Sequence, residues 1–304
     1  MARVCVWFSW AFLVLGVGLV PQGKAQPPLP EVKIGLLQSM FKDVSPAMVK
    51  SAAIPFQKML QKLAGLKGDV EMAPDYKELA QRLQNGKIDI AVFHGFEYSW
   101  VKNTPGMTPL VVTVPECGKV QACLVIHANS KAVAPKNLKG ACVAVPRGCK
   151  AHCEMFLERL RADIPVEDCC PCKCGQLTSE EALFAVANEK QEAVLVDVSS
   201  LLTFRENWPA AAKNIKVLAQ SEELPSAVIV YRQGALKPEA IASIRKGLID
   251  CVKTPTGQLF VLFWQLKGFK DADGAYNKLV NDALKAYPPP EEKVTLAPPP
   301  KGPK

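Results

Sequence analysis

The part of this sequence richest in reactive side chains is a cluster of cysteines in its second half. Cys149, His152 and Cys153 are spaced i, i+3 and i+4, so an expected helix would carry all three on one face. Cys172 and Cys174 follow in the Cys-dense segment DCCPCKCG. Thiolates and imidazole are ligands of zinc and other soft metals. These five residues are therefore one candidate metal site.

The same cysteines fit a second chemistry, which is disulfide formation. The chain has eleven cysteines, and setting aside Cys5 leaves ten, six of which lie between Cys149 and Cys174. An even number of cysteines in an exported protein favours disulfides over metal ligation. Cys117 and Cys123 flank a turn and would bridge a hairpin. The six clustered cysteines would tie the helix start at Cys149 and Cys153 to the loop over residues 169–174, with the exact pairs left open. Both chemistries stay open, with disulfides favoured.

The N-terminal segment indicates export. Arg3 precedes an apolar run over residues 4–20, and Gly23-Lys24-Ala25 has the small-x-small pattern of a cleavage site. This is the organisation of a secretory signal peptide, cut after Ala25. No later segment is apolar enough over a sufficient length to span a membrane. The sequence therefore predicts a secreted or periplasmic protein that does not span the membrane after cleavage.

Composition and motifs exclude several function classes. The formal net charge is +8, and removing Arg3 and Lys24 leaves +6, but the lysines are scattered rather than clustered. Nucleic-acid binding would need a basic patch with aromatic platforms, which the sequence lacks. A positive charge suits an anionic ligand, but a scattered excess is usually a solvated surface. The sequence has no phosphate-binding loop, no Gly-x-Ser-x-Gly and no HExxH. We therefore predict a binding protein that is not an enzyme and has no cofactor.

The remaining candidate residues follow strands in an alternating α/β pattern. Residues 75–100 predict an amphipathic helix that ends at Asn85-Gly86, then a buried strand over residues 88–93, then a turn at His94. Repeated β-α-β units of this kind predict parallel sheets, whose carboxyl edges are where ligands bind. His94 is thus either a ligand contact or a hydrogen-bonded structural histidine.

The order of the predicted elements divides the chain into two lobes. Residues 26–115 form the first part of lobe 1, residues 116–222 form lobe 2 with a Cys-rich insertion at 149–174, and residues 223–287 return to lobe 1. Residues 288–304 are rich in proline, which predicts an unpacked tail.

An ordered set of short motifs resembles the phosphate/phosphonate-type periplasmic substrate-binding proteins of ABC importers. The set consists of Ile34-Gly35-Leu36, Asp75-Tyr76, residues 84–91, Tyr98, residues 138–140, 143–145, 181–188 and 194–197. The resemblance covers residues 32–248 and implies a type II periplasmic-binding-protein fold. In that fold each lobe has a central, mainly parallel sheet flanked by helices, and two strands cross the hinge between the lobes.

The resemblance also implies a ligand site between the lobes. Tyr76 and Tyr98 match positions that contact ligand from lobe 1, and Asp197 matches an acidic position in lobe 2, although it would equally cap the next helix. Thr178 and Ser179 match polar positions that face the cleft. His94 joins the set as the residue at a strand end.

The chain departs from the family at the helix start of lobe 2. Where the family has a Ser/Thr-rich turn, this chain has residues 147–153, RGCKAHC. Arg147 and the backbone amides near Cys149 would hold an anion there. The resemblance therefore implies an extracytoplasmic protein that captures a small anionic solute, acts as a monomer and serves an ABC permease, with the solute itself left open. The alternatives are a secreted Cys-rich metal- or redox-handling protein on the same scaffold, and a module whose pocket has degraded.

Overall fold

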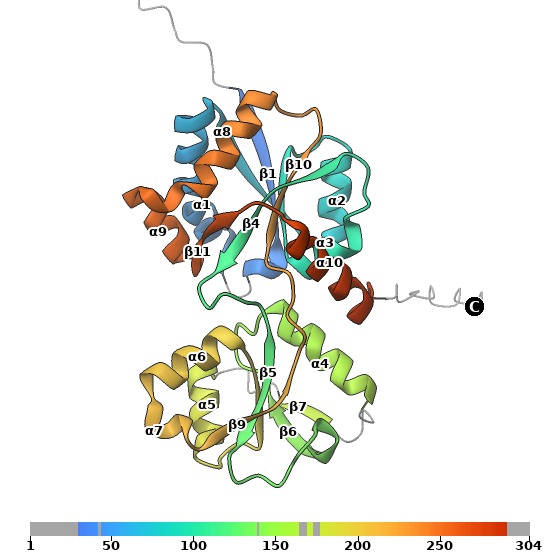
Figure 1. The fold of residues 1–304 in the computed structure, drawn as a ribbon, viewed down its shortest axis with the longest axis vertical. Coiled ribbons are helices and arrows are strands. Elements are labelled where there is room, and N and C mark those ends of the chain that lie inside the picture. The colour runs from blue at the N-terminus through green and yellow to red at the C-terminus, as the bar shows by residue number, and fades with distance from the viewer. Residues whose placement is uncertain (1–29, 42–43, 139, 164–168, 173–176, 291–304) are drawn as a thin grey trace, which may run out of the picture.

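A computed structural model describes residues 30–41, 44–138, 140–163, 169–172 and 177–290. These residues form two α/β lobes stacked along the long axis of the molecule and joined by two chain segments (Figure 1). The two-lobed α/β architecture predicted from the sequence is confirmed. The predicted signal peptide, residues 1–25, and residues 291–304 of the predicted tail lie outside the described residues.

Lobe 1 is built on a six-stranded sheet with the order β11-β4-β10-β3-β1-β2. Its strands are β1 (Glu31–Leu37), β2 (Lys67–Ala73), β3 (Ile90–Phe93), β4 (Met107–Pro115), β10 (Val228–Arg232) and β11 (Leu266–Lys270). Side chains alternate across this sheet, so Ile34 and Leu36 of β1 join one core cluster and Leu37 joins the cluster on the opposite face.

Helices cover both faces of this sheet (Figure 1). One face carries α1 (Pro46–Ala64), α8 (Pro238–Ile249) and α9 (Pro255–Phe263). The other face carries α2 (Tyr76–Gln84), α3 (Gly95–Val101) and α10 (Gly274–Ala286). Burial on both faces explains the nearly continuous apolar sequence of β3, residues IAVF.

Lobe 2 is built on a five-stranded sheet with the order β7-β6-β8-β5-β9. Its strands are β5 (Ala122–His127), β6 (Ala141–Ala144), β7 (Cys169–Cys172), β8 (Ala193–Asp197) and β9 (Ile215–Gln220). Helix α4 (Ala151–Asp163) packs on one face. The helices on the other face are α5 (Ser179–Ala187), α6 (Val198–Asn207) and α7 (Pro209–Ala212).

Each sheet is mixed in strand direction, where the sequence predicted mainly parallel sheets. The β1–β2, β1–β3, β6–β7 and β6–β8 pairs are parallel. The strands that carry the chain between the lobes pair antiparallel, as β10 does with β3 and β4, and β5 with β8 and β9. A parallel pair needs a crossover connection, whereas a strand that arrives from the other lobe is free to run in the opposite direction.

The two segments that join the lobes lie side by side. Residues 116–121 run from β4 to β5, and residues 221–227 run from β9 to β10. An isolated antiparallel bridge joins Val120 and Leu224, whose N–H donates to the Val120 carbonyl at 2.9 Å. The hinge is therefore a short two-stranded connection, as the sequence predicted.

Local signals at helix ends agree with the structure. Ser45 caps α1 by accepting a hydrogen bond from the Met48 N–H at 3.3 Å, and α2 ends at the predicted Asn85-Gly86. Two elements near the C-terminus were missed. They are β11, which follows the end of α9 at Phe263, and α10; neither has a counterpart in the sequence analysis.

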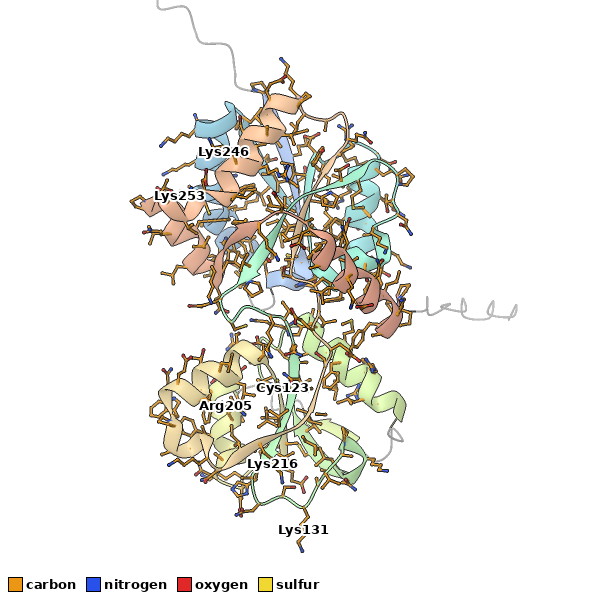
Figure 2. The ribbon with its side chains drawn as sticks, viewed as in Figure 1. Cys123, Lys131, Arg205, Lys216, Lys246 and Lys253 are labelled. Carbon is orange, nitrogen blue, oxygen red and sulfur yellow. The ribbon has the colours of Figure 1, made fainter. Side chains whose placement is uncertain are left out.

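The lysines are spread over both lobes. Figure 2 labels Lys131 at the end of lobe 2 farthest from lobe 1, and Lys246 and Lys253 on the helices of lobe 1. The helices within the described ranges include none with the length and apolarity needed to cross a bilayer.

Candidate functional site between the lobes

A cavity of about 860 Å³ lies between the two lobes and extends into lobe 1, between its sheet and helices α1 and α9. Its lining comes from three places. Lobe 2 contributes the first residues of several helices, the hinge contributes residues such as Gln121 and Pro225, and lobe 1 contributes strand ends and an apolar wall. Such a volume is typical of a site for a small organic molecule.

The N-termini of three lobe 2 helices meet at this cavity. Gly148, Cys149 and Lys150 precede α4, Thr178 caps α5, and Asp197 caps α6; residues at all three positions line the cavity. The first N–H groups of a helix have no partner within the helix, and the helix dipole is positive at that end. The lobe 2 side of the cavity is therefore suited to an anion.

An ion pair joins two of these helix starts. The Lys150 ammonium lies 2.6 Å from Asp197 Oδ2, and the Asp197 side chain is only 6% exposed. Asp197 Oδ1 accepts hydrogen bonds from the Ser199 hydroxyl at 2.5 Å and the Ser200 N–H at 2.8 Å. Burial alone would raise the pKa of Asp197, but the Lys150 charge and these hydrogen bonds outweigh it and hold that pKa below its usual value.

Thr178 is fixed by a reciprocal cap. Its hydroxyl accepts from the Glu181 N–H at 3.2 Å, and its own N–H donates to Glu181 Oε2 at 2.8 Å. The cap aligns the start of α5 with the cavity, where Thr178, Ser179 and Glu180 all form part of the lining.

Lobe 1 faces this surface with the turn that follows β3. His94 is the N-cap residue of α3, and its ring stacks on Phe96 with centroids 5.4 Å apart. Gly95 lies against the hinge, because a Cβ at this position would come within 2.1 Å of the Pro225 carbonyl oxygen. The glycine thus allows the end of β3 to approach the returning hinge segment closely.

Of the eight predicted ligand residues, five line the cavity. They are His94, Cys149, Thr178, Ser179 and Asp197. Asp197 has both of the roles considered from the sequence, since it caps α6 and also faces the cavity.

Tyr76 and Tyr98 are corrections to the prediction. Both belong to the core on the far face of the lobe 1 sheet and are absent from the cavity lining. Tyr76 packs edge-on against Trp100 with ring centroids 4.8 Å apart, and burial raises the pKa of Tyr98. The motifs place these tyrosines correctly at the starts of α2 and α3, but the helices turn them toward α10 rather than lobe 2.

Arg147 is a third correction. Its side chain is exposed and outside the lining, while its backbone N–H donates to the Leu177 carbonyl at 2.8 Å. The cations that line the cavity are instead Lys119 and Lys150, neither of which the sequence analysis selected. Ser199 and Ser200 were missed as well. Their position directly after β8 and Asp197 is the signal that would have identified them.

The cysteines do not form a metal site within the described part of the chain. No group of three or more metal-ligating side chains assembles there. Cys149 and His152 line the cavity, but Cys153 lies behind them, fully buried, and burial together with its hydrogen bond to Cys149 raises its pKa well above the usual value. The side chains of Cys172 and Cys174 lie outside the described residues.

The predicted Cys117–Cys123 disulfide is not formed. Both residues are thiols, as are Cys149, Cys153 and Cys251. Cys123 points into the lobe 2 core from β5, whereas the Cys117 sulfur donates to the Lys119 carbonyl at 3.0 Å. Disulfides among the cysteines of residues 169–174 stay a prediction.

Solved structures with the same fold support the two-lobed arrangement. XAC2383 from Xanthomonas citri, solved with bound chloride, has a TM-score of 0.60 and 15% identity, covering 84% of this chain and 97% of that one. PhnD1 from Prochlorococcus marinus, solved with methylphosphonate, has a TM-score of 0.57 and 12% identity, with coverage of 84% and 97%. The binding protein PA3383 of a Pseudomonas aeruginosa ABC phosphonate transporter has a TM-score of 0.55 and 17% identity, with coverage of 85% and 88%. At such identities the likeness establishes the fold.

The sequence itself identifies the family. A search of curated proteins finds no match. The family model described as "ABC transporter, phosphonate, periplasmic substrate-binding protein" matches residues 39–276, which is most of the chain. The chain therefore belongs to the phosphonate periplasmic substrate-binding proteins of ABC transporters, which makes it a periplasmic binding component with a permease partner, in a family of binding proteins rather than enzymes.

Proposed function

We propose that this protein captures an oxyanion of the phosphonate class between its lobes and presents it to the permease of an ABC importer. The observation that carries the proposal is the meeting of three helix N-termini and the Lys150 ammonium at one cavity. Helix N-termini and a lysine are a recurrent combination for binding tetrahedral oxyanions. The similar fold of PhnD1, which holds methylphosphonate, supports the same use of this cavity.

The proposed contacts come from both lobes. Backbone N–H groups at the starts of α4, α5 and α6 bind the oxyanion from lobe 2, and His94 approaches it from lobe 1. An ammonium has three N–H donors, and Lys150 directs two of them to Asp197 and Ser199, which leaves one for a ligand oxygen. Asp197 holds the Lys150 side chain in place, and the Lys150 ammonium in turn compensates the negative charge of the buried Asp197 carboxylate.

Ligand capture in this proposal is a closure of the lobes about the hinge. The moving units are lobe 1, residues 26–115 and 223–287, and lobe 2, residues 116–222, within a monomer that has lost residues 1–25 as a signal peptide. The paired segments at Val120 and Leu224 are the only connections between the two sheets in the described chain, so bending there moves one lobe against the other.

Calorimetric titration with methylphosphonate, phosphate, phosphite and sulfate tests the proposal. We expect at least one of these anions to bind and to raise the melting temperature of the protein. Lys150→Ala should weaken that binding at least tenfold. Lys131→Ala, which removes a lysine at the far end of lobe 2, is the matched control and should bind as the wild type does (Figure 2).

Two results would contradict the proposal. One is a folded wild-type protein to which none of the four anions binds, and the other is equal affinity in Lys150→Ala and the wild type. Small-angle scattering adds an independent measurement, because closure predicts a smaller radius of gyration when the bound anion is present.

A further inference from the structure

The larger part of the cavity wall is apolar and lies inside lobe 1. The sheet contributes Ile34, Val70 and Val92, and the helices contribute Val49 and Phe56 of α1 and Phe260 of α9. These side chains belong to the core cluster between the sheet and the α1–α9 pair. An oxyanion held at the lobe 2 helix starts leaves this wall uncovered.

The cavity is also much larger than a phosphonate head group requires. A phosphonate head group displaces on the order of three water molecules, at about 30 Å³ each. The cavity holds about 860 Å³. This volume spans the space between the lobes and its extension into lobe 1, and the lining of the extension comes from the sheet and from α1 and α9. Protein interiors are packed to crystal density, so an extension of the cavity among core side chains is unusual for a finished core. The space is better explained as room for a second part of the ligand.

Two polar atoms at the edge of the apolar wall support this reading. Ser39 Oγ and Trp264 Nε1 are buried, and neither has a hydrogen-bond partner among the described residues. Both residues line the cavity, and the Trp264 ring packs edge-on against Phe41 at 5.3 Å between centroids. Buried polar atoms of a completed core are almost always hydrogen-bonded. Their orphaned state marks this wall as a surface that a ligand completes.

We propose that the ligand is an amphipathic organic anion, with its phosphonate head at the N-termini of α4, α5 and α6 and its hydrocarbon substituent in the apolar part of the cavity under α1 and α9. The proposal rests on the proposed function and names the substrate class of the same site. Ser39 just after β1, His94 just after β3 and Thr113 of β4 line the same continuous cavity as both groups, so one molecule can occupy both parts. This geometry selects arylphosphonates and alkylphosphonates with longer chains over methylphosphonate and inorganic anions.

Calorimetric titration with methyl-, butyl- and octylphosphonate tests the chain-length dependence. Burying one CH2 group is worth ~0.8 kcal/mol, which corresponds to about a fourfold lower Kd per added methylene until the cavity is filled. We therefore expect butylphosphonate to bind at least tenfold more tightly than methylphosphonate, and octylphosphonate more tightly again.

Filling the cavity gives the matching variant. Ala53 of α1 lines the cavity and is buried, so Ala53→Leu should reduce the gain from methyl- to octylphosphonate while leaving the Kd of methylphosphonate within about twofold. Ala47→Leu adds the same atoms at an exposed position of the same helix and should keep the full gain. Val92→Phe fills the cavity from the sheet side and should reduce the chain-length gain in the same way. It replaces Ala53→Leu in the experiment if that variant does not fold.

The outcomes separate this inference from the proposed function. Equal Kd values across the three phosphonates would overturn the amphipathic ligand while anion capture stands. An unchanged chain-length gain in both filling variants would also overturn it, because the substituent would then lie elsewhere. Failure of all three phosphonates, phosphate and sulfate to bind would overturn the proposed function, and the inference with it.

Discussion

Lys150 Nζ lies 2.6 Å from Asp197 Oδ2, which joins the start of α4 to the start of α6 across the floor of the interlobe cavity. The Asp197 carboxylate is buried and the Lys150 side chain is half-exposed, so the ammonium is the more accessible member of the pair. The arrangement places a cation among three helix N-termini while a nearby carboxylate balances its charge.

Asp197→Asn should tighten anion binding. The variant keeps a side-chain oxygen that can cap α6, removes the negative charge beside the ligand and leaves the Lys150 ammonium to the anion. The expected change is a Kd about three- to tenfold lower, on the order of 1 kcal/mol. Titration calorimetry of wild type and variant with the same phosphonate measures it. Weaker binding by the variant would contradict this prediction and show that holding Lys150 in place outweighs the cost of the nearby negative charge.

The same carboxylate makes stability depend on acid. Since the pKa of Asp197 is lowered in the folded state, its contribution is present above the unfolded value of 3.8 and is lost as the pH falls through the folded value. Urea denaturation of wild type and Asp197→Asn, compared across pH values below about 5, should show a shallower loss of stability in the variant. Parallel curves would contradict this.

Glu97 predicts pH dependence of the opposite sign. Burial raises the pKa of Glu97 from 4.5 to about 7; a backbone hydrogen bond at His94 lowers it and the Asp75 charge raises it. Its Oε2 atom is buried without a hydrogen-bond partner among the described residues. The folded protein therefore keeps this proton over a range where the unfolded chain releases it, and stability falls as the pH rises from 4.5 to about 7.

Glu97→Gln removes this titration. We expect the variant to be more stable than wild type above about pH 7, by on the order of 3 kcal/mol if the whole shift is realised, and the two to converge near the unfolded pKa. Urea midpoints measured at several pH values test this. The same slope in both proteins would assign the pH dependence to other groups.

Gly95→Ala should destabilise lobe 1 at the hinge. The added Cβ would come within 2.1 Å of the Pro225 carbonyl oxygen and 2.4 Å of the Ser226 carbonyl oxygen, both of which are backbone atoms. Relief requires a shift of the hinge segment, at a cost of about 1–3 kcal/mol. Gly274→Ala is the control, since a Cβ there meets nothing within 4 Å, and thermal unfolding of both variants makes the comparison. Equal melting temperatures would contradict the close approach.

Arg159 connects lobe 2 to the end of α10 through the hinge. Its guanidinium donates to both carboxylate oxygens of Glu222 at 2.7 and 2.8 Å, and it lies 5.0 Å from the ring centroid of Tyr287, whose hydroxyl also donates to Glu222. Arg159→Ala should change the balance of lobe orientations more than stability, because the Arg159–Glu222 pair is partly exposed.

Small-angle scattering of the anion-free protein measures that balance. We expect a larger or broader radius of gyration in Arg159→Ala and less than about 1 kcal/mol of lost stability. Arg161→Ala is the matched control, since Arg161 pairs only with Glu158 on its own helix in the described chain. Identical scattering from all three proteins would show that the contact does not influence the hinge.

Much of the fold follows from local patterns. Asn85-Gly86 ends α2, Ser45 and Thr178 cap α1 and α5, and the apolar runs of β3 and β8 form buried strands, because capping and burial depend on residues near in sequence. The elements that the sequence analysis missed depend instead on residues far apart in the sequence. Strand β11 pairs with β4, about 150 positions earlier in the chain, and no local periodicity reports that pairing.

The sequence by itself determined the two-lobed α/β class, the helix starts that face the cleft and the family. Only the tertiary structure decided which side chains of those starts reach the ligand space. Tyr98 and His94 are four residues apart, a spacing that would put both on one face of a helix, yet one enters the core and the other lines the cavity. The reason is that His94 is the N-cap residue and has a non-helical backbone, whereas Tyr98 lies within α3. In the turn before α4, Lys150 rather than Arg147 meets Asp197, a contact that depends on how α4 and α6 pack together. The apolar part of the cavity under α1 and α9 likewise exists only once distant elements pack together.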